Sequence, residues 1–380
     1  MKVHPNPDLV TKEDNKSRWN LPDTRRHGFQ NLHRLTRYSL SFRSDQVLSL
    51  TRDINSCIGA RADVTTLTST QHFCAMVVVR NQTLLFEKYA SDFSPNHPHT
   101  IMSISKMTLN LIVGELVAAG RIDLGRTISE YLPRIGSGYA NATVQDVLNM
   151  NIENSYQEDY SDPNTGSYAQ ELAIGWRLPE EGQRESTLKE FLTTITAPEN
   201  GSLENSTGHA LYKSANSDVL GWLCEEVSGK PLRQWLLEIV EATGIEGNWH
   251  MHTDRKGFPI VDGGVSLNAR DLARFGQLFA RRGRGVMGRQ VGNADFIEKS
   301  RRSPGPPLPD PKSFCSYSNQ TMTNGHWIGH GGYGGQFMLA DLDTGVSVSF
   351  FSVLETRDAI DLDHFVEMVH MMAAVAAEFG

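Results

Sequence analysis

The chain has 380 residues, of which 39% are hydrophobic, and a formal net charge of -8. This length allows a large core and predicts two structural regions that fold as one unit. The negative charge disfavours nucleic acid and anionic membranes as partners, and no run of eighteen apolar residues suggests a membrane span.

The N-terminus and the cysteines bear on the cellular location. Residues 1–20 are polar and carry no apolar run, so no secretory signal is expected and a cytoplasmic location is predicted. Four scattered cysteines fit buried free thiols better than a zinc site or a redox motif. They are Cys57, Cys74, Cys224 and Cys315.

The N-terminal elements begin with a segment that has no periodicity. Residues 1–40 are expected to form an extended arm over the body of the protein. Apolar residues at helical spacing predict an amphipathic helix over 45–58. Two β-rich runs, 73–79 and 83–89, flank the turn Arg80-Asn81-Gln82 and predict a hairpin.

The middle of the chain, residues 101–267, is dominated by helical patterns separated by Gly, Asn and Pro loops. Beyond it, 336–340 and 346–353 flank a turn and predict two strands, and 359–379 predicts a final helix. Strands and helices therefore come from both ends of the chain.

The expected fold class is α/β (α+β), with an antiparallel sheet built from both chain ends and flanked by N- and C-terminal helices. A mostly helical region is inserted into this framework. The predicted regions are 1–100 plus 268–380, and 101–267, with the active site between them.

The segment Met102-Ser103-Ile104-Ser105-Lys106 begins a predicted helix, since apolar residues follow at helical spacing and Gly120 marks its expected end. Ser103 and Lys106 then share one face. A serine hydroxyl needs a neighbouring base, and a lysine can serve when burial lowers its pKa. At a helix start the Ser103 amide has no partner within the helix and can donate to an oxyanion.

Ser-x-x-Lys alone is a weak signal, because a second copy occurs at Ser186-Thr187-Leu188-Lys189. Ser186 is interpreted there as an N-cap, which is also the plain alternative for Ser103. Two distant segments favour a catalytic Ser103. Tyr212-Lys213-Ser214 precedes a predicted helix, and the glycine-dense Gly329-His330-Gly331-Gly332-Tyr333 enters a strand, where backbone can approach a substrate closely.

These three segments, in this order and at this spacing, resemble the motifs of the penicillin-recognising serine hydrolases. That superfamily includes class C β-lactamases, D-peptidases and family VIII esterases, and the likeness runs from about Phe73 to the C-terminus. Within it the sequence is most similar to the 6-aminohexanoate-dimer hydrolases, the nylon-oligomer amidases. Their middle region also reads like Glu158-Asp159-Tyr160-x-Asp162-Pro163 and Gly175-Trp176-Arg177.

The resemblance implies a role for each site residue. Lys106 would accept the proton of Ser103, Tyr212 would pass a proton to the leaving amine or alcohol, and water would hydrolyse the acyl-enzyme. The backbone N–H groups of Ser103 and Tyr333 would form the oxyanion hole. The supporting or substrate-binding positions would be Tyr160, Trp176, Ser214, His330, Gly331 and Gly332.

Two departures from the superfamily bear on the substrate. Ser214 stands where many relatives carry Asn, and His330 stands where penicillin-processing enzymes carry Lys. Histidine is mostly neutral at pH 7, so a fixed cation for a β-lactam carboxylate is missing. Small linear amides or carboxylic esters are therefore the predicted substrates, with β-lactamase or D-amino-acid peptidase activity as the alternative within the same fold.

Two alternatives belong to other classes. A zinc metallohydrolase would use His250, His252 and Asp254, although Arg255 stands where the last histidine of that motif belongs. The other is a non-catalytic binding protein, against which the presence of the complete catalytic set argues. The expected partner is a small-molecule amide or ester, with no cofactor, metal, nucleic acid or membrane, and a homodimer is left open.

Overall fold

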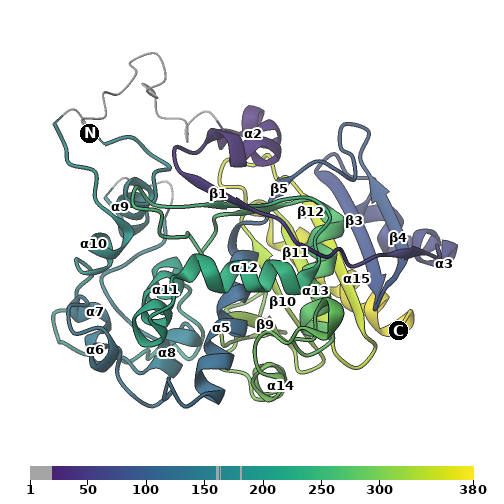
Figure 1. Ribbon diagram of the computed structural model, residues 1–380. Helices are drawn as coiled ribbons and strands as arrows, with labels where there is room; N and C mark the ends of the chain where they lie inside the picture. Colours follow the sequence, from purple (N-terminus) through teal and green to yellow (C-terminus); the bar gives the residue numbers. More distant parts are fainter. Residues whose placement is uncertain (1–18, 160–161, 163, 180–181) are drawn as a thin grey trace.

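The computed structural model describes residues 19–159, 162, 164–179 and 182–380. Its centre is an eight-stranded sheet with the strand order β2-β4-β3-β12-β11-β10-β9-β8 (Figure 1). The edge pair β2 and β4 is parallel, and the other neighbours are antiparallel. In sheet order the strands are Thr51–Arg52, Thr83–Tyr89, Phe73–Arg80, Val346–Ser352, Gln336–Asp341, Trp327–Gly332, Thr321–Thr323 and Ser316–Ser318.

Helices cover both faces of this sheet, which explains why β12 is buried along its whole length. On one face lies α13 (Ala269–Ala280), where Ser347 and Ser349 donate to carbonyl oxygens of the helix at 2.8 Å. Against the other face packs α15 (Leu362–Glu378), together with Val348 and Phe350 in one apolar cluster. Alternate residues of β12 therefore face α13 and α15, because side chains along a strand point to opposite faces of the sheet in turn.

A second, four-stranded sheet has the order β1-β6-β7-β5, and all its pairs are antiparallel. Its strands are Ser39–Phe42, Trp249–His252, Val265–Leu267 and His99–Thr100. The helix α2 (Pro22–Leu35) packs against the last three of them. This small sheet therefore ties the N-terminal part of the chain to the segment that precedes Ser103.

Most remaining helices gather beside the large sheet, on the left of Figure 1. There α11 packs against α5 and α8, and α12 joins the same bundle. In chain order the remaining helices are α3 Ser56–Ala60, α4 Ala62–Leu67, α5 Met107–Ala118, α6 Ile128–Tyr131, α7 Ser137–Ala140, α8 Val144–Leu148, α9 Gly166–Ala173, α10 Leu188–Leu192, α11 Ser214–Ser228, α12 Leu232–Thr243 and α14 Ala294–Arg302. The described residues also contain the 3-10 helices η2 Met102–Lys106 and η3 Val286–Gly288.

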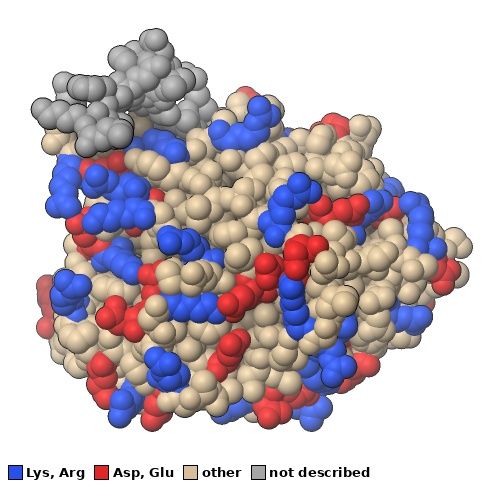
Figure 2. Space-filling view, viewed as in Figure 1, with Lys and Arg blue, Asp and Glu red and all other residues tan. Residues whose placement is uncertain are grey.

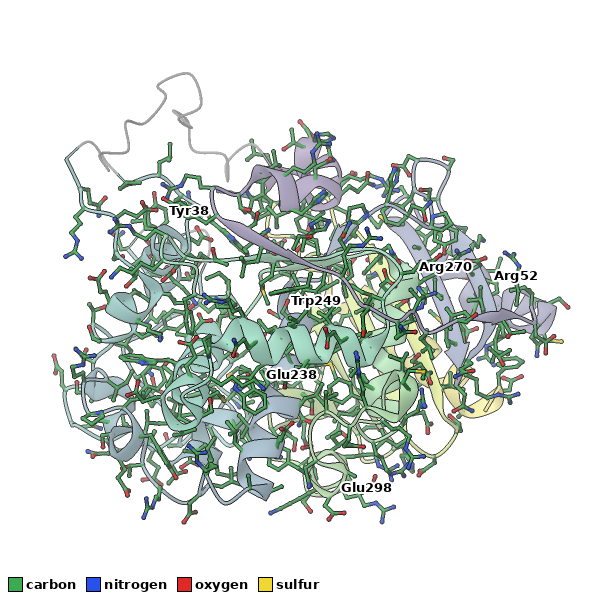
Figure 3. All side chains as sticks on the ribbon, viewed as in Figure 1. Tyr38, Arg52, Glu238, Trp249, Arg270 and Glu298 are labelled. Carbon is green, nitrogen blue, oxygen red and sulfur yellow. The ribbon has the colours of Figure 1, made fainter. Side chains whose placement is uncertain are left out.

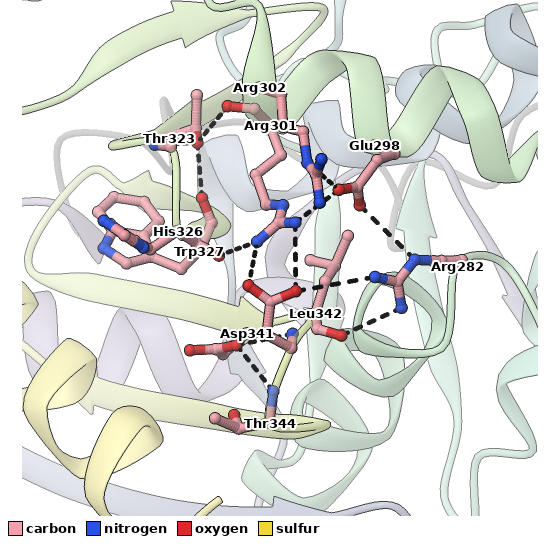
Figure 4. A network of polar contacts seen from close by, with 12 residues as sticks. Arg282, Glu298, Arg301, Arg302, Thr323, His326, Trp327, Asp341, Leu342 and Thr344 are labelled. Carbon is pink, nitrogen blue, oxygen red and sulfur yellow. Dashed lines mark hydrogen bonds and ion pairs between the residues drawn. The ribbon is translucent and has the colours of Figure 1, made fainter.

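Buried or half-buried charges connect distant elements. Arg301 on α14 donates to the His326 carbonyl oxygen at 3.0 Å and to Asp343 at 2.7 Å, and thereby joins the helix to two strand connections (Figure 4). Glu87 on β4 pairs with Arg52 at 2.8 Å and with Arg270 at 2.7 Å. Figure 3 labels the two arginines, on the right of the view. On the face in Figure 2, basic and acidic side chains are interspersed.

The predicted hairpin, the two C-terminal strands, the final helix and the α/β fold class are all confirmed. The extended arm over 1–40 is wrong for its described part. Residues 19–40 contain α2 and the start of β1. The helix packs on the body of the protein through Phe29 and Leu32, whose side chains are fully buried. The buried guanidinium of Arg25 also donates to the carbonyl oxygens of Leu354 and Thr356, both at 2.6 Å.

The predicted helix over 45–58 is also wrong, since helix forms only from Ser56. The backbone amides of Thr51, Asp53 and Asn55 donate to the edge of the sheet at Gln82, Leu84 and Leu85. Pairing along a sheet edge therefore outweighs the helical spacing of the apolar residues.

Three smaller expectations have different outcomes. The cap of α10 is Thr187, which forms a capping box with Glu190, so the assignment to Ser186 was wrong by one residue. All four cysteines are free, but Cys57 is exposed. None of the helices in the described part of the chain has the length and apolar character needed to cross a bilayer. The division into two regions stays a prediction.

Candidate active site

Ser103 lies in a 3-10 turn, η2, and not in the first turn of an α-helix, because α5 begins only at Met107. The preceding residue, Met102, has a φ of 47°, in the left-handed region that non-glycine residues rarely adopt. This sharp turn presents the Ser103 side chain to the cleft, while Lys106 is fully buried beneath it.

The amine of Lys106 has three close contacts. Its Nζ atom lies 3.0 Å from Ser103 Oγ, 3.1 Å from Ser214 Oγ and 2.5 Å from the backbone oxygen of Asp262. A carbonyl oxygen can only accept, and the Ser214 hydroxyl already donates to Glu158 at 2.8 Å. Both contacts therefore use N–H donors, and the lone pair of a neutral Lys106 is left facing the Ser103 hydroxyl.

Burial is the main influence on the charge of Lys106. Burial lowers the pKa of the amine, and this effect outweighs the opposing effect of the carboxylates of Asp262, Glu158 and Asp218, which raise the pKa. Two of these acids are themselves buried, and burial raises the pKa of Asp262 to about 6 and that of Asp218 well above its usual value. Gln170 holds the pair, since its Nε2 atom donates to Asp218 at 2.6 Å and to Asp262 at 3.3 Å.

Tyr212 lies just before α11, and its ring centroid is 5.1 Å from Lys106 Nζ. Burial raises the pKa of the phenol well above 10, and the charge of Glu158 acts in the same direction. Ser103 is near enough to oppose this shift, yet the buried hydroxyl makes no hydrogen bond of normal geometry with any described residue. Burial therefore keeps Tyr212 a protonated phenol with a proton to donate.

The third motif lies in the last part of β10, which packs against η2. A Cβ atom on Gly332 would lie 2.5 Å from the Ile101 carbonyl oxygen, so only glycine allows the strand to approach the Ser103 turn this closely. Tyr333 comes next, and the Ser103 and Tyr333 positions line the same cleft. This proximity is what an oxyanion hole from their two amides requires.

His330 is fully buried and neutral. Burial lowers its pKa to about 3, and the charge of Lys106 acts in the same direction. Its Nδ1 atom lies 2.6 Å from the Gly331 carbonyl oxygen, which can only accept, so Nδ1 carries the proton. Nε2 then accepts from the Tyr317 hydroxyl at 3.1 Å. His330 therefore supplies no positive charge to the cleft.

Ser103 lies where two pockets meet. The first is lined by Trp176 and by Trp19, whose ring meets that of Trp176 edge-on with 5.7 Å between the ring centroids. Trp176 is held by its Nε1 atom, which donates to His252 at 3.0 Å. The second pocket contains Tyr212 and the Gly331 to Gly335 segment. The nucleophile position can therefore be reached from two sides.

The structure does not bring the proposed zinc ligands together. His252 accepts a hydrogen bond from the Trp176 side chain, and His250 stacks on His33 with 4.4 Å between the ring centroids. Asp254 accepts from the backbone amides of its own loop. In the described part of the chain no group of three or more acidic, His or Cys side chains is arranged to hold a metal ion.

Tyr160, a predicted supporting residue, lies outside the described residues. Three other residues near the site were not predicted. Glu158 appeared in the sequence only within a stretch that resembles known proteins, yet it accepts from both the amide and the hydroxyl of Ser214. Trp19 lies in the segment assigned to an arm, and no local signal marked it. Tyr317 comes from β8, an edge strand of three residues.

Comparison with known proteins gives a consistent result. The family model described as "Beta-lactamase" matches residues 71–367. A 6-aminohexanoate-dimer hydrolase of Paenarthrobacter ureafaciens is 36% identical over 222 residues, or 57% of this chain. That match spans about half of the relative, 54% of its length.

Solved structures show the same fold at lower identity. A Bacillus anthracis protein proposed to be a 6-aminohexanoate-dimer hydrolase has a TM-score of 0.79 at 21% identity and covers 99% of both chains. A D-stereospecific amidohydrolase from Streptomyces sp. has a TM-score of 0.57 at 17% identity, over 80% of this chain and 95% of its own. The resemblance and the fold class predicted from the sequence are thereby confirmed.

Proposed function

Because the chain belongs to the beta-lactamase family, we propose that it is a serine hydrolase that cleaves small linear amides or carboxylic esters through a covalent acyl-enzyme. The observation that carries this proposal is the contact set of Lys106. Two acceptors occupy its N–H groups, and the third direction points to Ser103 Oγ at 3.0 Å. A buried amine in this position is suited to take a proton from the serine.

In the proposed first step, Ser103 Oγ attacks the carbonyl carbon and its proton passes to Lys106 Nζ. The carbonyl oxygen becomes an oxyanion, which the amides of Ser103 and Tyr333 are placed to stabilise. Tyr212 then donates its proton to the leaving nitrogen or oxygen as that bond to carbon breaks. The proton on Lys106 restores the phenol, and an ester between Ser103 and the acyl group remains.

In the second step, water attacks the acyl carbon and loses a proton to Lys106. The bond between carbon and Ser103 Oγ breaks, the serine recovers its proton, and a carboxylic acid leaves. Tyr212 suits the donor role because burial keeps its phenol protonated. Ser214 contacts the Lys106 amine directly and Glu158 orients Ser214, so both act as positioning residues that exchange no proton with the substrate in this scheme.

Small linear amides or esters are preferred here over lactams for two reasons. The buried imidazole of His330 is neutral and engaged with Tyr317 and Gly331, so it offers no cation for a β-lactam carboxylate. The relative at 36% identity is named as a hydrolase of a linear amide dimer. We also propose a cytoplasmic location, which the free state of all four cysteines supports.

A substrate panel with a nucleophile variant tests this function. Purified protein should hydrolyse p-nitrophenyl butyrate and at least one short linear amide, with nitrocefin and a D-alanyl peptide as comparison substrates. Ser103→Ala should abolish turnover, and a fluorophosphonate should add one adduct mass to the wild-type protein and none to the variant. Near wild-type turnover by Ser103→Ala would disprove the assignment.

A further inference from the structure

The first pocket is the place for the acyl group if the proposed function holds. Tyr212, the proposed proton donor, lines the second pocket and is not among the described residues that line the first. A leaving nitrogen or oxygen must face its proton donor when the bond breaks, so the acyl part lies on the other side of Ser103. The first pocket encloses about 500 Å³ and the second about 1650 Å³, so the acyl side is the more confined.

Trp176 forms a wall of this pocket close to the reaction centre. An added Cβ atom on Gly263 would lie 3.7 Å from Trp176 Cη2 and 3.9 Å from the carbonyl carbon of Met102, the residue before Ser103. The far edge of the indole and the Ser103 turn therefore lie against the same glycine. Because Trp176 and Ser103 both line the pocket, the orientation of the indole limits the space beside the nucleophile.

The backbone alone does not fix the orientation of this ring. Trp176 lies in a loop after α9, and its amide donates to the Glu171 carbonyl oxygen at 2.9 Å, which leaves the side-chain torsions free. The edge-on contact with Trp19 is compatible with two orientations of the indole that differ by a half-turn about the bond from Cβ to the ring. The hydrogen bond from Nε1 to His252 at 3.0 Å allows one of them, because the indole has a single donor.

His252 is itself firmly placed as the acceptor. It lies on β6, where its amide donates to the Gly264 carbonyl oxygen at 2.8 Å and its carbonyl oxygen accepts from Ile260 at 2.9 Å. Its side chain is fully buried. The indole N–H can only donate, so the imidazole Nδ1 atom carries no proton.

The surroundings of His252 keep its imidazole neutral. Burial lowers its pKa to about 3, the nearby His33 and His250 act in the same direction, and the backbone of Leu32 opposes them. A protonated imidazole would turn a second donor toward the indole N–H and break the contact. The hydrogen bond to Trp176 therefore persists at neutral pH.

We propose that His252 is a positioning residue that fixes the orientation of Trp176 and thereby restricts the acyl group to short chains. His252 acts through the indole, since it lines neither pocket and touches no reacting atom. The inference rests on the proposed hydrolase function and adds to it a limit on the length of the acyl group.

Acyl-chain selectivity tests this role. The measured quantity is the ratio of kcat/KM for p-nitrophenyl octanoate to that for the acetate. His252→Leu has a side chain of similar size without an acceptor, and it should raise the ratio by about fivefold, the factor that corresponds to one ordinary hydrogen bond. His252→Asn should keep the wild-type ratio, because its Oδ1 atom replaces Nδ1 as an acceptor.

His250→Leu is the matched control. It removes an imidazole from the same strand, two residues away, that stacks on His33 instead of contacting the indole. Its ratio of octanoate to acetate hydrolysis should equal the wild-type ratio. An unchanged ratio in His252→Leu, or the same rise in His250→Leu, overturns the proposal while hydrolysis itself stands.

A double-mutant cycle separates positioning from a general structural role. Trp176→Phe removes the N–H group that His252 accepts, so the further change His252→Leu should leave the ratio of the Trp176→Phe protein as it is. A rise of the same size in both backgrounds would mean that His252 acts on selectivity without the indole. That result overturns the proposal.

The indole N–H resonance gives a readout that does not depend on catalysis. In ¹⁵N-labelled protein, the resonance that is missing from Trp176→Phe belongs to Trp176, and in the wild type it should exchange slowly with water. Rapid exchange overturns the proposal, even where His252→Leu fails to fold. If Ser103→Ala cleaves the esters as fast as the wild type, the proposed function fails and the acyl limit falls with it, whereas the indole resonance is unaffected.

Discussion

Lys106 Nζ lies 3.0 Å from Ser103 Oγ within one buried turn, and two fixed acceptors hold the amine in that direction. A base and a nucleophile at this separation can exchange a proton without any movement of the backbone.

The first prediction concerns pH. Only the neutral amine of Lys106 can accept a proton, so kcat/KM for p-nitrophenyl butyrate should fall as the pH drops through the lowered pKa of Lys106. Lys106→Met should lose roughly 10²- to 10⁴-fold in kcat. Initial rates between pH 5 and 9 for both proteins, with circular dichroism as the folding control, provide the check. Near wild-type kcat in Lys106→Met would contradict the role of Lys106 as the base.

The second prediction separates amides from esters. Tyr212→Phe removes the buried donor, and an amine leaves poorly without a proton whereas an alkoxide needs less help. The variant should lose roughly 10²-fold or more in kcat on an amide and about tenfold on an ester with the same acyl group. Steady-state rates on such a matched pair give the answer. Equal losses on the two substrates would count against proton donation by Tyr212.

The third prediction concerns the close approach of β10. In Gly332→Ala the new Cβ atom would meet the Ile101 carbonyl oxygen at 2.5 Å, so the Ser103 turn and the strand must move apart. We expect roughly a 10²-fold loss in kcat/KM, since a displacement near 1 Å can cost that much. Gly331→Ala is the matched comparison, because its nearest neighbour is the Phe365 ring, which can shift. Similar losses in the two variants would refute the steric argument.

The fourth prediction concerns the acyl pocket. Trp19 lines the first pocket and packs edge-on against Trp176, so Trp19→Ala should open space for longer acyl groups. The ratio of kcat/KM for p-nitrophenyl octanoate to that for the acetate should rise by about tenfold, a typical effect for methylene groups in an apolar pocket. Acetate hydrolysis serves as the internal reference. A ratio that falls or stays unchanged would show that the acyl group binds elsewhere.

Much of the framework follows from local sequence patterns. Alternating or continuous apolar runs predicted β3, β4, β11 and β12, and helical spacing predicted α15, because these elements pack with the period that their sequences display. The three motif segments, with Ser103, Tyr212 and Tyr333, were also visible in the chain. Their residue types and order were enough to predict a shared cleft.

The remainder depended on contacts that no local pattern contains. Edge pairing with β4 replaced the expected helix over 45–58, and the buried guanidinium of Arg25 anchored a helix in the expected arm. The neutral state of His330 required its burial and its bond to Tyr317, and the lowered pKa of Lys106 required the burial of its amine. Sequence alone determined which chemical groups are present and which elements present them. Only the tertiary structure decided their protonation and their partners, because desolvation and hydrogen bonding depend on residues far apart in the chain.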